Sequence, residues 1–240
     1  MQVHVFSSAD QVAEAAAMVF ASELYRKPDL VMGLATGNTP VALYQRLIQL
    51  NREGMIDFSS ARSFNLDEYE GLSGAHPSSY RYFMDEKLFD HINIDKKNTF
   101  VPSGLNDLWE NAAAYDRMIE EAGGIELQLL GIGCNGHIGF NEPSGAFVNG
   151  TNVAALTEST IKANAYGFER IEDVPRRAIS LGIGGIMAAK RVILLATGDS
   201  KAQAIRDTLK GEPSPAMPSS ILRFHRNVQF FLDSGAASLL

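Results

Sequence analysis

Two hydrophobic patterns alternate along the chain. Short apolar runs rich in Val, Ile and Leu are followed by longer segments in which apolar residues recur every three or four positions. The first pattern is typical of buried strands and the second of amphipathic helices, so the alternation predicts β–α units around a mostly parallel sheet. The predicted strands are VHVF at 3, LVMGLA at 30, RSFNL at 62, TFVP at 99, IELQLLGIG at 125, AISLGI at 178, VILLAT at 192 and VQFFLD at 228.

Amphipathic stripes between these strands predict helices that face the sheet. The stripe residues are Val12, Ala16, Val19 and Phe20 in the first predicted helix and Leu108, Ala112, Tyr115 and Ile119 in another. No long Pro-, Gly- or Ser-rich linker divides the chain, and the broken segment GEPSPAMPSS at 211 is interpreted as a loop before a short last helix. We therefore expect one α/β domain over residues 1–240.

Charge and composition narrow the class of protein. The formal net charge is −7 and no Lys/Arg-rich run is present, which argues against a nucleic-acid partner, although a small anion could still bind a local patch. The single cysteine, Cys134, permits no intramolecular disulfide and fits a reducing compartment. No apolar run approaches the eighteen residues of a membrane span, and the first residues do not resemble a secretion signal. We expect a soluble cytoplasmic protein with no membrane partner.

Two similar segments predict phosphate contacts. GLATGNTP at 33 and LLATGDSK at 194 each place Thr-Gly and a polar helix start directly after a strand. Such loops, here Thr36–Thr39 and Gly198–Lys201, would aim free backbone N–H groups and the positive end of a helix at one point. Neither matches the Walker pattern, so nucleoside triphosphate hydrolysis is disfavoured. Two ordinary strand-to-helix turns are the alternative.

Candidate chemistry gathers where strands end. In open parallel sheets ligands bind beyond the carboxyl ends of the strands. Four polar loops are expected to converge there: Thr36–Thr39, Asp67–Tyr69, Asn135–Glu142 and Gly198–Lys201. By itself, Asp67 after RSFNL is either a helix-capping acceptor or a general base.

The segment GIGCNGHIGFNEP, residues 131–143, places a histidine, a glutamate and two asparagines among four glycines directly after an apolar run. It satisfies G-x-G-x-x-G, but glycines and a proline interrupt what should be a helix, so dinucleotide binding is weakly supported. His137 lacks a second histidine or a cysteine pair at ligand spacing, which disfavours a metal. Cys134 leaves a thiol nucleophile open, and His137 alone could simply pack or cap. Asn135 and Glu142 are instead near enough in sequence to bond the ring of His137, and a bond from Glu142 would fix its tautomer for acid–base work.

Several motifs, in order, resemble the glucosamine-6-phosphate deaminase family over nearly the whole chain: GLATGNTP, FNLDEYEGL, HPSSYRYFM, GIGCNGHIGFNEP and VPRRAISLGIGGI. The resemblance implies a mostly parallel Rossmann-like sheet with helices on both faces. It also implies hydrolytic deamination of glucosamine 6-phosphate to fructose 6-phosphate and ammonia, in amino-sugar catabolism. It implies neither a metal nor an organic cofactor.

The resemblance also implies roles for particular residues. His137 would exchange a proton with the ring oxygen, Glu142 and Asn135 would orient it, and Asp67 would move the proton from carbon 2 to carbon 1. The residues expected to hold the phosphate are Thr36, Gly37, Asn38, Thr39 and Lys201.

This chain departs from the family pattern at three places. Many members have aspartate where Asn135 stands, although a shorter bacterial group also uses asparagine. ANAYGF places Tyr166 where an arginine commonly helps to bind phosphate, and a phenol lacks the permanent bidentate charge of a guanidinium. The basic residues of the allosteric site in regulated members are absent from NGTNVAAL at 149, so we expect no activation by the acetylated sugar phosphate. The family includes hexamers and monomers, and the sequence does not decide between them.

Two other functions compete with deamination. A hydrolase of the 6-phosphogluconolactonase type would need the Gly-His loop, but it typically carries a different form of that loop, lacks GFNEP and has no use for an enolising base at Asp67. A non-catalytic sugar-phosphate sensor is the third possibility; such regulators carry a basic helix-turn-helix segment ahead of the domain, whereas the first predicted strand here begins at about residue 3.

Overall fold

A large parallel sheet forms the centre of the computed structural model, which describes residues 1–240. All six of its strand pairings are parallel. In spatial order its strands are β1 (Gln2–Phe6), β10 (Val228–Asp233), β9 (Arg191–Ala196), β6 (Leu127–Leu130), β2 (Val31–Leu34), β3 (Arg62–Asn65) and β5 (Thr99–Phe100). The central strands β2 and β6 are buried along their whole length, which explains why their sequences, VMGL and LQLL, are apolar except for Gln128.

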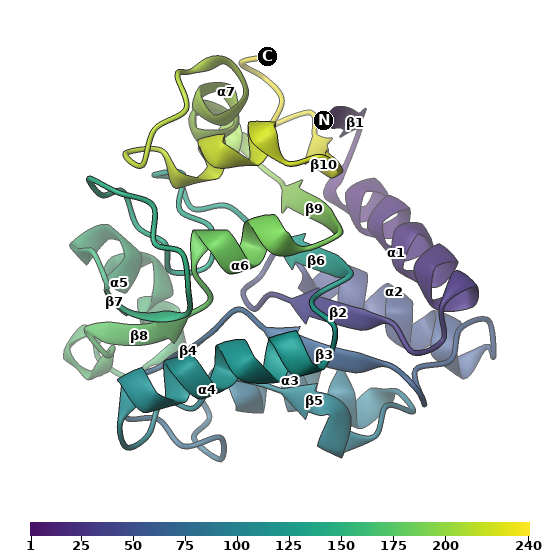
Figure 1. Ribbon diagram of the computed structural model, residues 1–240. Coiled ribbons are helices and arrows are strands. Elements are labelled where there is room, and N and C mark those ends of the chain that lie inside the picture. Colours follow the sequence, from purple (N-terminus) through teal and green to yellow (C-terminus); the bar gives the residue numbers. More distant parts are fainter.

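Seven α-helices surround this sheet: α1 (Ala9–Arg26), α2 (Val41–Arg52), α3 (Tyr80–Lys87), α4 (Leu108–Glu121), α5 (Glu158–Asn164), α6 (Ile183–Ala188) and α7 (Ala202–Lys210). Figure 1 shows α4 and α6 in front of the sheet and α2, drawn fainter, behind it. The predicted stripes face inward, since Val12, Ala16 and Phe20 of α1 and Ala112 and Tyr115 of α4 are buried. The predicted fold class, α/β with a mostly parallel sheet and helices on both faces, is confirmed.

A second, three-stranded antiparallel sheet lies beside the carboxyl ends of the large one. It consists of β4 (Asp67–Tyr69), β8 (Arg177–Ser180) and β7 (Asn152–Ala155). The run at 178 was correctly predicted as a strand, but its partners β4 and β7 were not predicted. β4 reads Asp-Glu-Tyr and β7 is partly exposed, so neither shows the apolar pattern of a buried strand.

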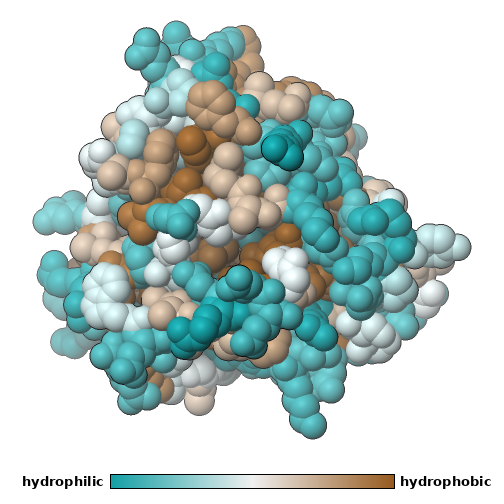
Figure 2. Space-filling model, viewed as in Figure 1, coloured by the Kyte–Doolittle hydropathy of each residue, from teal (hydrophilic) through white to brown (hydrophobic).

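One cluster of 49 buried apolar residues extends from Val12 to Ala236. The first and last strands, β1 and β10, also pair side by side, which brings the two ends of the chain together (Figure 1). We infer from this shared core a single domain over residues 1–240. No helix is both long and apolar enough to cross a membrane. On the face seen in Figure 2, apolar side chains gather between α7 and α6, and most of the remaining face is hydrophilic.

Candidate active site

A cavity of about 620 Å³ opens where the course of the chain through the sheet changes direction. From β2 the chain proceeds to β3 and β5 on one side, and from β6 it proceeds to β9 and β10 on the other. The loops after β2 and β6 therefore separate, as they do at the ligand-binding crevice of open α/β sheets. Every residue predicted for the site lines this cavity except Glu142.

The loop between β2 and α2 forms one wall of the cavity. Gly37 has φ of 100°, which turns the chain sharply between the strand and the helix. None of the backbone N–H groups of residues 36–39 donates a hydrogen bond within the chain. Free donors of this kind, together with the positive end of the α2 dipole, are typical of sites that bind anions such as phosphate.

The similar loop after β9 differs from the prediction. The backbone N–H of Gly198 donates to both carboxylate oxygens of Asp233, at 3.0 and 2.9 Å, so it is not free for a ligand. Only Lys201 of the segment 198–201 lines the cavity, and its Nζ lies 3.5 Å from Sγ of Cys134. This loop therefore contributes a cation and not a second set of free amides.

Asp67 begins strand β4, although the sequence pattern predicts a loop there. Antiparallel pairing with Ser180 of β8 fixes its backbone. Its side chain is only 6% exposed, yet it accepts no hydrogen bond from any group of the protein, which excludes the helix-capping alternative. Burial, and secondarily the neighbouring charge of Glu68, raises the pKa of Asp67 to about 8. A buried, unpartnered carboxyl on a cavity wall is suited to exchange protons with a ligand.

The glycine-rich loop after β6 folds tightly around His137. The N–H of Gly133 donates to the carbonyl of His137, and the N–H of Gly136 donates to the carbonyl of Gly133. A Cβ on Gly133 would lie 2.3 Å from Cε1 of His137, so the imidazole packs directly on the glycine backbone. Gly133 is therefore required by the packing of the histidine ring.

Glu142 connects His137 to the neighbouring polar groups. Its Oε2 lies 3.6 Å from Nδ1 of His137, which is an ion-pair contact and too long for a hydrogen bond. Although burial opposes ionisation, the contact with His137 and the hydroxyl of Thr160, which donates to Oε1, lower the pKa of Glu142 to about 2. The carboxylate is thus ionised over the physiological range.

Asn135 acts on a different part of His137 from the one predicted. Its Oδ1 accepts the backbone N–H of His137 at 3.2 Å, and its Nδ2 donates to Oε2 of Glu142 at 2.8 Å. No hydrogen bond joins Asn135 to the imidazole. Asn135 therefore holds the loop and the carboxylate in place, whereas the sequence pattern predicts a bond to the ring.

The two candidate acid–base groups lie on the same cavity. Gly139, two residues after His137, adopts φ of 55°, and a Cβ there would lie 3.5 Å from Oδ2 of Asp67. The loop of residues 131–143, called the histidine loop from here on, thus passes directly beside the Asp67 carboxyl. The side chains of His137 and Asp67 line the same cavity. No group of three or more His, Cys, Asp or Glu side chains is placed to hold a metal ion.

Sequence reasoning missed part of the cavity wall. Tyr80 comes from α3, and Thr160 and Asn164 come from α5. The motif HPSSYRYFM contains Tyr80, but nothing in its spacing reveals that the ring reaches the site. Tyr166, at the position where an arginine is common, lines the cavity and is 67% exposed.

Comparison with known proteins identifies the family. The model of the family described as glucosamine-6-phosphate isomerases/6-phosphogluconolactonase matches residues 6–230. The chain belongs to this family. The glucosamine-6-phosphate deaminase of Clostridium perfringens strain SM101 is 51% identical over 241 residues, with all of both chains covered. That of Shewanella woodyi is also 51% identical, with all of this chain and 91% of the relative covered.

Solved structures of this family share the same fold. A monomeric glucosamine-6-phosphate deaminase superposes with a TM-score of 0.98 at 41% identity, with all of both chains covered. The 6-phosphogluconolactonase of Trypanosoma brucei superposes with a TM-score of 0.76 at 21% identity, covering all of this chain and 98% of that one. At that identity the lactonase shares the fold alone.

Proposed function

We propose that this chain is a glucosamine-6-phosphate deaminase, which converts D-glucosamine 6-phosphate and water to D-fructose 6-phosphate and ammonia. The observation that carries the proposal is the buried, unpartnered carboxyl of Asp67 on the same cavity wall as the loop of His137. The names of the relatives at about half identity support it. A cavity of 620 Å³ is within the range of small-molecule sites, about 300–1,000 Å³.

The phosphate binds where the free donors are. The amides of Thr36 to Thr39 supply neutral N–H groups, and Lys201 supplies the positive charge. A hydrogen bond to a charged group contributes about 1.5–3 kcal/mol. This anchoring fixes the sugar so that its reactive carbons lie between Asp67 and His137.

His137 catalyses the opening of the sugar ring. The imidazole donates a proton to the ring oxygen as the bond from that oxygen to carbon 1 breaks, and the carbon 1 hydroxyl gives its proton to solvent water, which produces the open-chain aldehyde. Glu142 is ionised, and its Oε2 lies 3.6 Å from Nδ1 of His137, where it helps to orient the imidazole for this transfer. Asn135 holds both the loop and Glu142 in this arrangement.

Isomerisation and hydrolysis follow on the open chain. Asp67 removes the proton of carbon 2, the electron pair forms the enol, and the proton returns at carbon 1. The amino group on carbon 2 then becomes an imine, to which water adds with release of ammonia and formation of the ketone. Positioned proton transfer of this kind contributes about 10²–10⁴ in rate.

An ammonium-release assay with glucosamine 6-phosphate tests the proposal. Hydrolysis of 6-phosphogluconolactone is measured alongside, because that reaction requires acid–base chemistry at the ring but no proton transfer at carbon 2. We expect ammonium and fructose 6-phosphate in equal amounts. Lactone hydrolysis without ammonium release would reject the proposal in favour of the lactonase, and binding of the sugar phosphate with neither reaction would favour a sensor.

A further inference from the structure

Glu68 directly follows the proposed base and is itself almost completely buried, with 2% of its surface exposed. Successive side chains of a strand point to opposite faces, so Glu68 of β4 points away from the cavity that Asp67 faces. A buried carboxylate requires partners to offset the loss of hydration. The groups that donate hydrogen bonds to Glu68 indicate its structural role.

The carboxylate of Glu68 joins β4 to the beginning of helix α3. Its Oε1 accepts the backbone N–H groups of Tyr69, at 2.8 Å, and of Tyr80, at 2.9 Å. Its Oε2 accepts the N–H of Arg81 at 3.0 Å. Two of the otherwise unpaired donors of the first helical turn are therefore satisfied by a residue of the strand that carries Asp67.

The first turn of helix α3 also places a side chain on the cavity wall. The ring of Tyr80 lines the cavity and stacks on Phe140 of the histidine loop, with 6.0 Å between ring centroids. Its hydroxyl donates to that of Tyr69 at 3.1 Å. Any shift of α3 relative to β4 would therefore move a wall of the cavity relative to Asp67.

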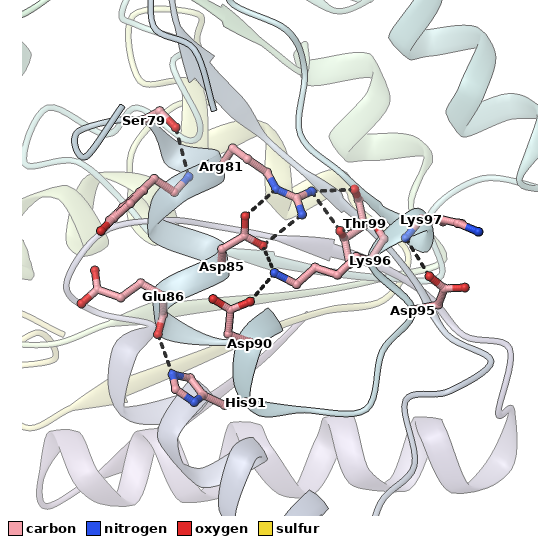
Figure 3. Close-up of polar contacts among 11 residues, drawn as sticks. Ser79, Arg81, Asp85, Glu86, Asp90, His91, Asp95, Lys96, Lys97 and Thr99 are labelled. Atoms are coloured by element: carbon pink, nitrogen blue, oxygen red, sulfur yellow. Dashed lines mark hydrogen bonds and ion pairs between the residues drawn. The ribbon is translucent and has the colours of Figure 1, made fainter. Parts of the chain in front are cut away.

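The rest of α3 is held by an ion network (Figure 3). The guanidinium of Arg81 donates to both carboxylate oxygens of Asp85 and to the carbonyl and hydroxyl oxygens of Thr99 in β5. Lys96 pairs with Asp85 at 2.7 Å and with Asp90. These contacts fix α3 to the large sheet, so the N–H groups that Glu68 binds are themselves immobile.

We propose that Glu68 is a positioning residue that locks β4 to the first turn of α3 and so holds the Asp67 carboxyl and the Tyr80 ring in their reactive arrangement. The inference rests on the proposed deaminase function. Besides burial, which has the larger effect, the charge of Glu68 also favours the neutral form of Asp67. The titratable groups around Asp67 and on the cavity that it faces are Tyr44 of α2, Glu68 and Tyr69 of β4, Tyr80 of α3, Tyr115 of α4, Cys134, His137, Tyr166 and Lys201.

Glu68→Gln and Glu68→Asp separate the two consequences. Glu68→Gln removes the charge, and the NH₂ group of the glutamine then faces a backbone N–H that the carboxylate had accepted. Because this contact is lost, we expect kcat to fall about 10- to 100-fold with KM nearly unchanged. The acid limb of the pH profile of kcat/KM, expected near pH 8 from Asp67, should move to lower pH because the neighbouring charge that raises the pKa of Asp67 is lost. Glu68→Asp keeps the charge but shortens the reach, so kcat should fall while the acid limb stays in place.

Glu126→Gln is the matched control. Glu126 is also a buried carboxylate that accepts a backbone N–H, that of Val31, together with Lys27 and Lys190, but it lies at the opposite end of the sheet. This variant should lose stability and keep the kcat and pH profile of the unmodified protein. If the Glu68 variants change only in stability, as Glu126→Gln does, the positioning role is rejected.

Two further results keep the test decisive. If Glu68→Gln does not fold, Glu68→Asp is measured alone, and an unchanged kcat in that variant would overturn the proposal. If the unmodified protein releases no ammonium, the proposed function fails. Ammonium release by the unmodified protein with unaltered kcat and pH limb in Glu68→Gln overturns the positioning role alone.

Discussion

Replacement of Asp67 by asparagine should lower activity and raise stability at the same time. The carboxyl is buried without a hydrogen-bond partner, and its pKa is raised from 3.8 to about 8. In the unfolded chain it ionises near its ordinary pKa. Each pKa unit corresponds to about 1.4 kcal/mol, so at pH 8 its ionisation disfavours the folded state by on the order of 5 kcal/mol.

The sign of the pH dependence follows from the raised pKa. The folded state binds a proton that the unfolded state releases, so the contribution of Asp67 to stability is complete below pH 3.8 and is lost as the pH rises toward 8. The amide that replaces the carboxyl in Asp67→Asn does not titrate, but a buried amide without a partner costs about 1–3 kcal/mol. At pH 8 we expect a net gain of about 2 kcal/mol or more, or roughly 4–8 °C in Tm.

Thermal unfolding and ammonium release measure the two effects. We expect Asp67→Asn to lose a factor on the order of 10² or more in kcat while glucosamine 6-phosphate still binds, because an amide does not act as the base. Its stability advantage over the unmodified protein should grow between pH 4 and pH 8. Near-normal turnover, or a stability difference that does not change with pH, would refute the reasoning.

Asp116→Asn is the control for this prediction. The carboxylate of Asp116 in α4 accepts the backbone N–H of Thr151, at 3.1 and 3.0 Å, and it does not line the cavity. Its replacement should therefore destabilise the protein and leave kcat unchanged, the reverse of the result expected for Asp67→Asn.

Four further outcomes are expected. Lys201→Ala should raise KM about 10- to 100-fold with little change in kcat, since it removes the only lysine of the cavity; steady-state kinetics with an unchanged KM would exclude it from the phosphate site. Tyr166→Arg should lower KM for the sugar phosphate and the Ki of inorganic phosphate by severalfold, and no change in either constant would show that position 166 does not reach the phosphate. Glu142→Gln should lower kcat about 10-fold or more, because the ionised partner of His137 is lost; activity at several pH values measures this, and full activity would contradict the role. Addition of N-acetylglucosamine 6-phosphate should not activate the protein, and sigmoidal kinetics relieved by it would contradict this expectation.

The large sheet was predictable because its central strands are buried on both faces. Continuous apolar runs such as VMGL of β2 can be recognised without knowledge of their neighbours. β4 could not be recognised in this way, because its residues Asp67 and Glu68 are acidic and nonetheless buried. Local pattern and burial disagree there because the site requires a poorly solvated carboxyl, and such conflicts are expected at functional residues.

The roles of the loops were predictable only where they depend on nearby residues. The free amides of 36–39 follow from a local turn between β2 and α2, whereas the amide of Gly198 is bound by Asp233, 35 residues later in the chain. Thr160, which donates to Glu142, is likewise brought to the site by the packing of α5. Contacts between distant segments leave no mark in the spacing of either segment.

The fate of the hydrogen on carbon 2 tests the central claim most directly. Glucosamine 6-phosphate deuterated at carbon 2 is incubated with the unmodified protein and with Asp67→Asn, and the label is followed by NMR. We predict that the unmodified protein removes deuterium from carbon 2 as it forms fructose 6-phosphate, and that Asp67→Asn binds the sugar but leaves the label in place. Loss of deuterium at the same rate from both proteins would contradict the account.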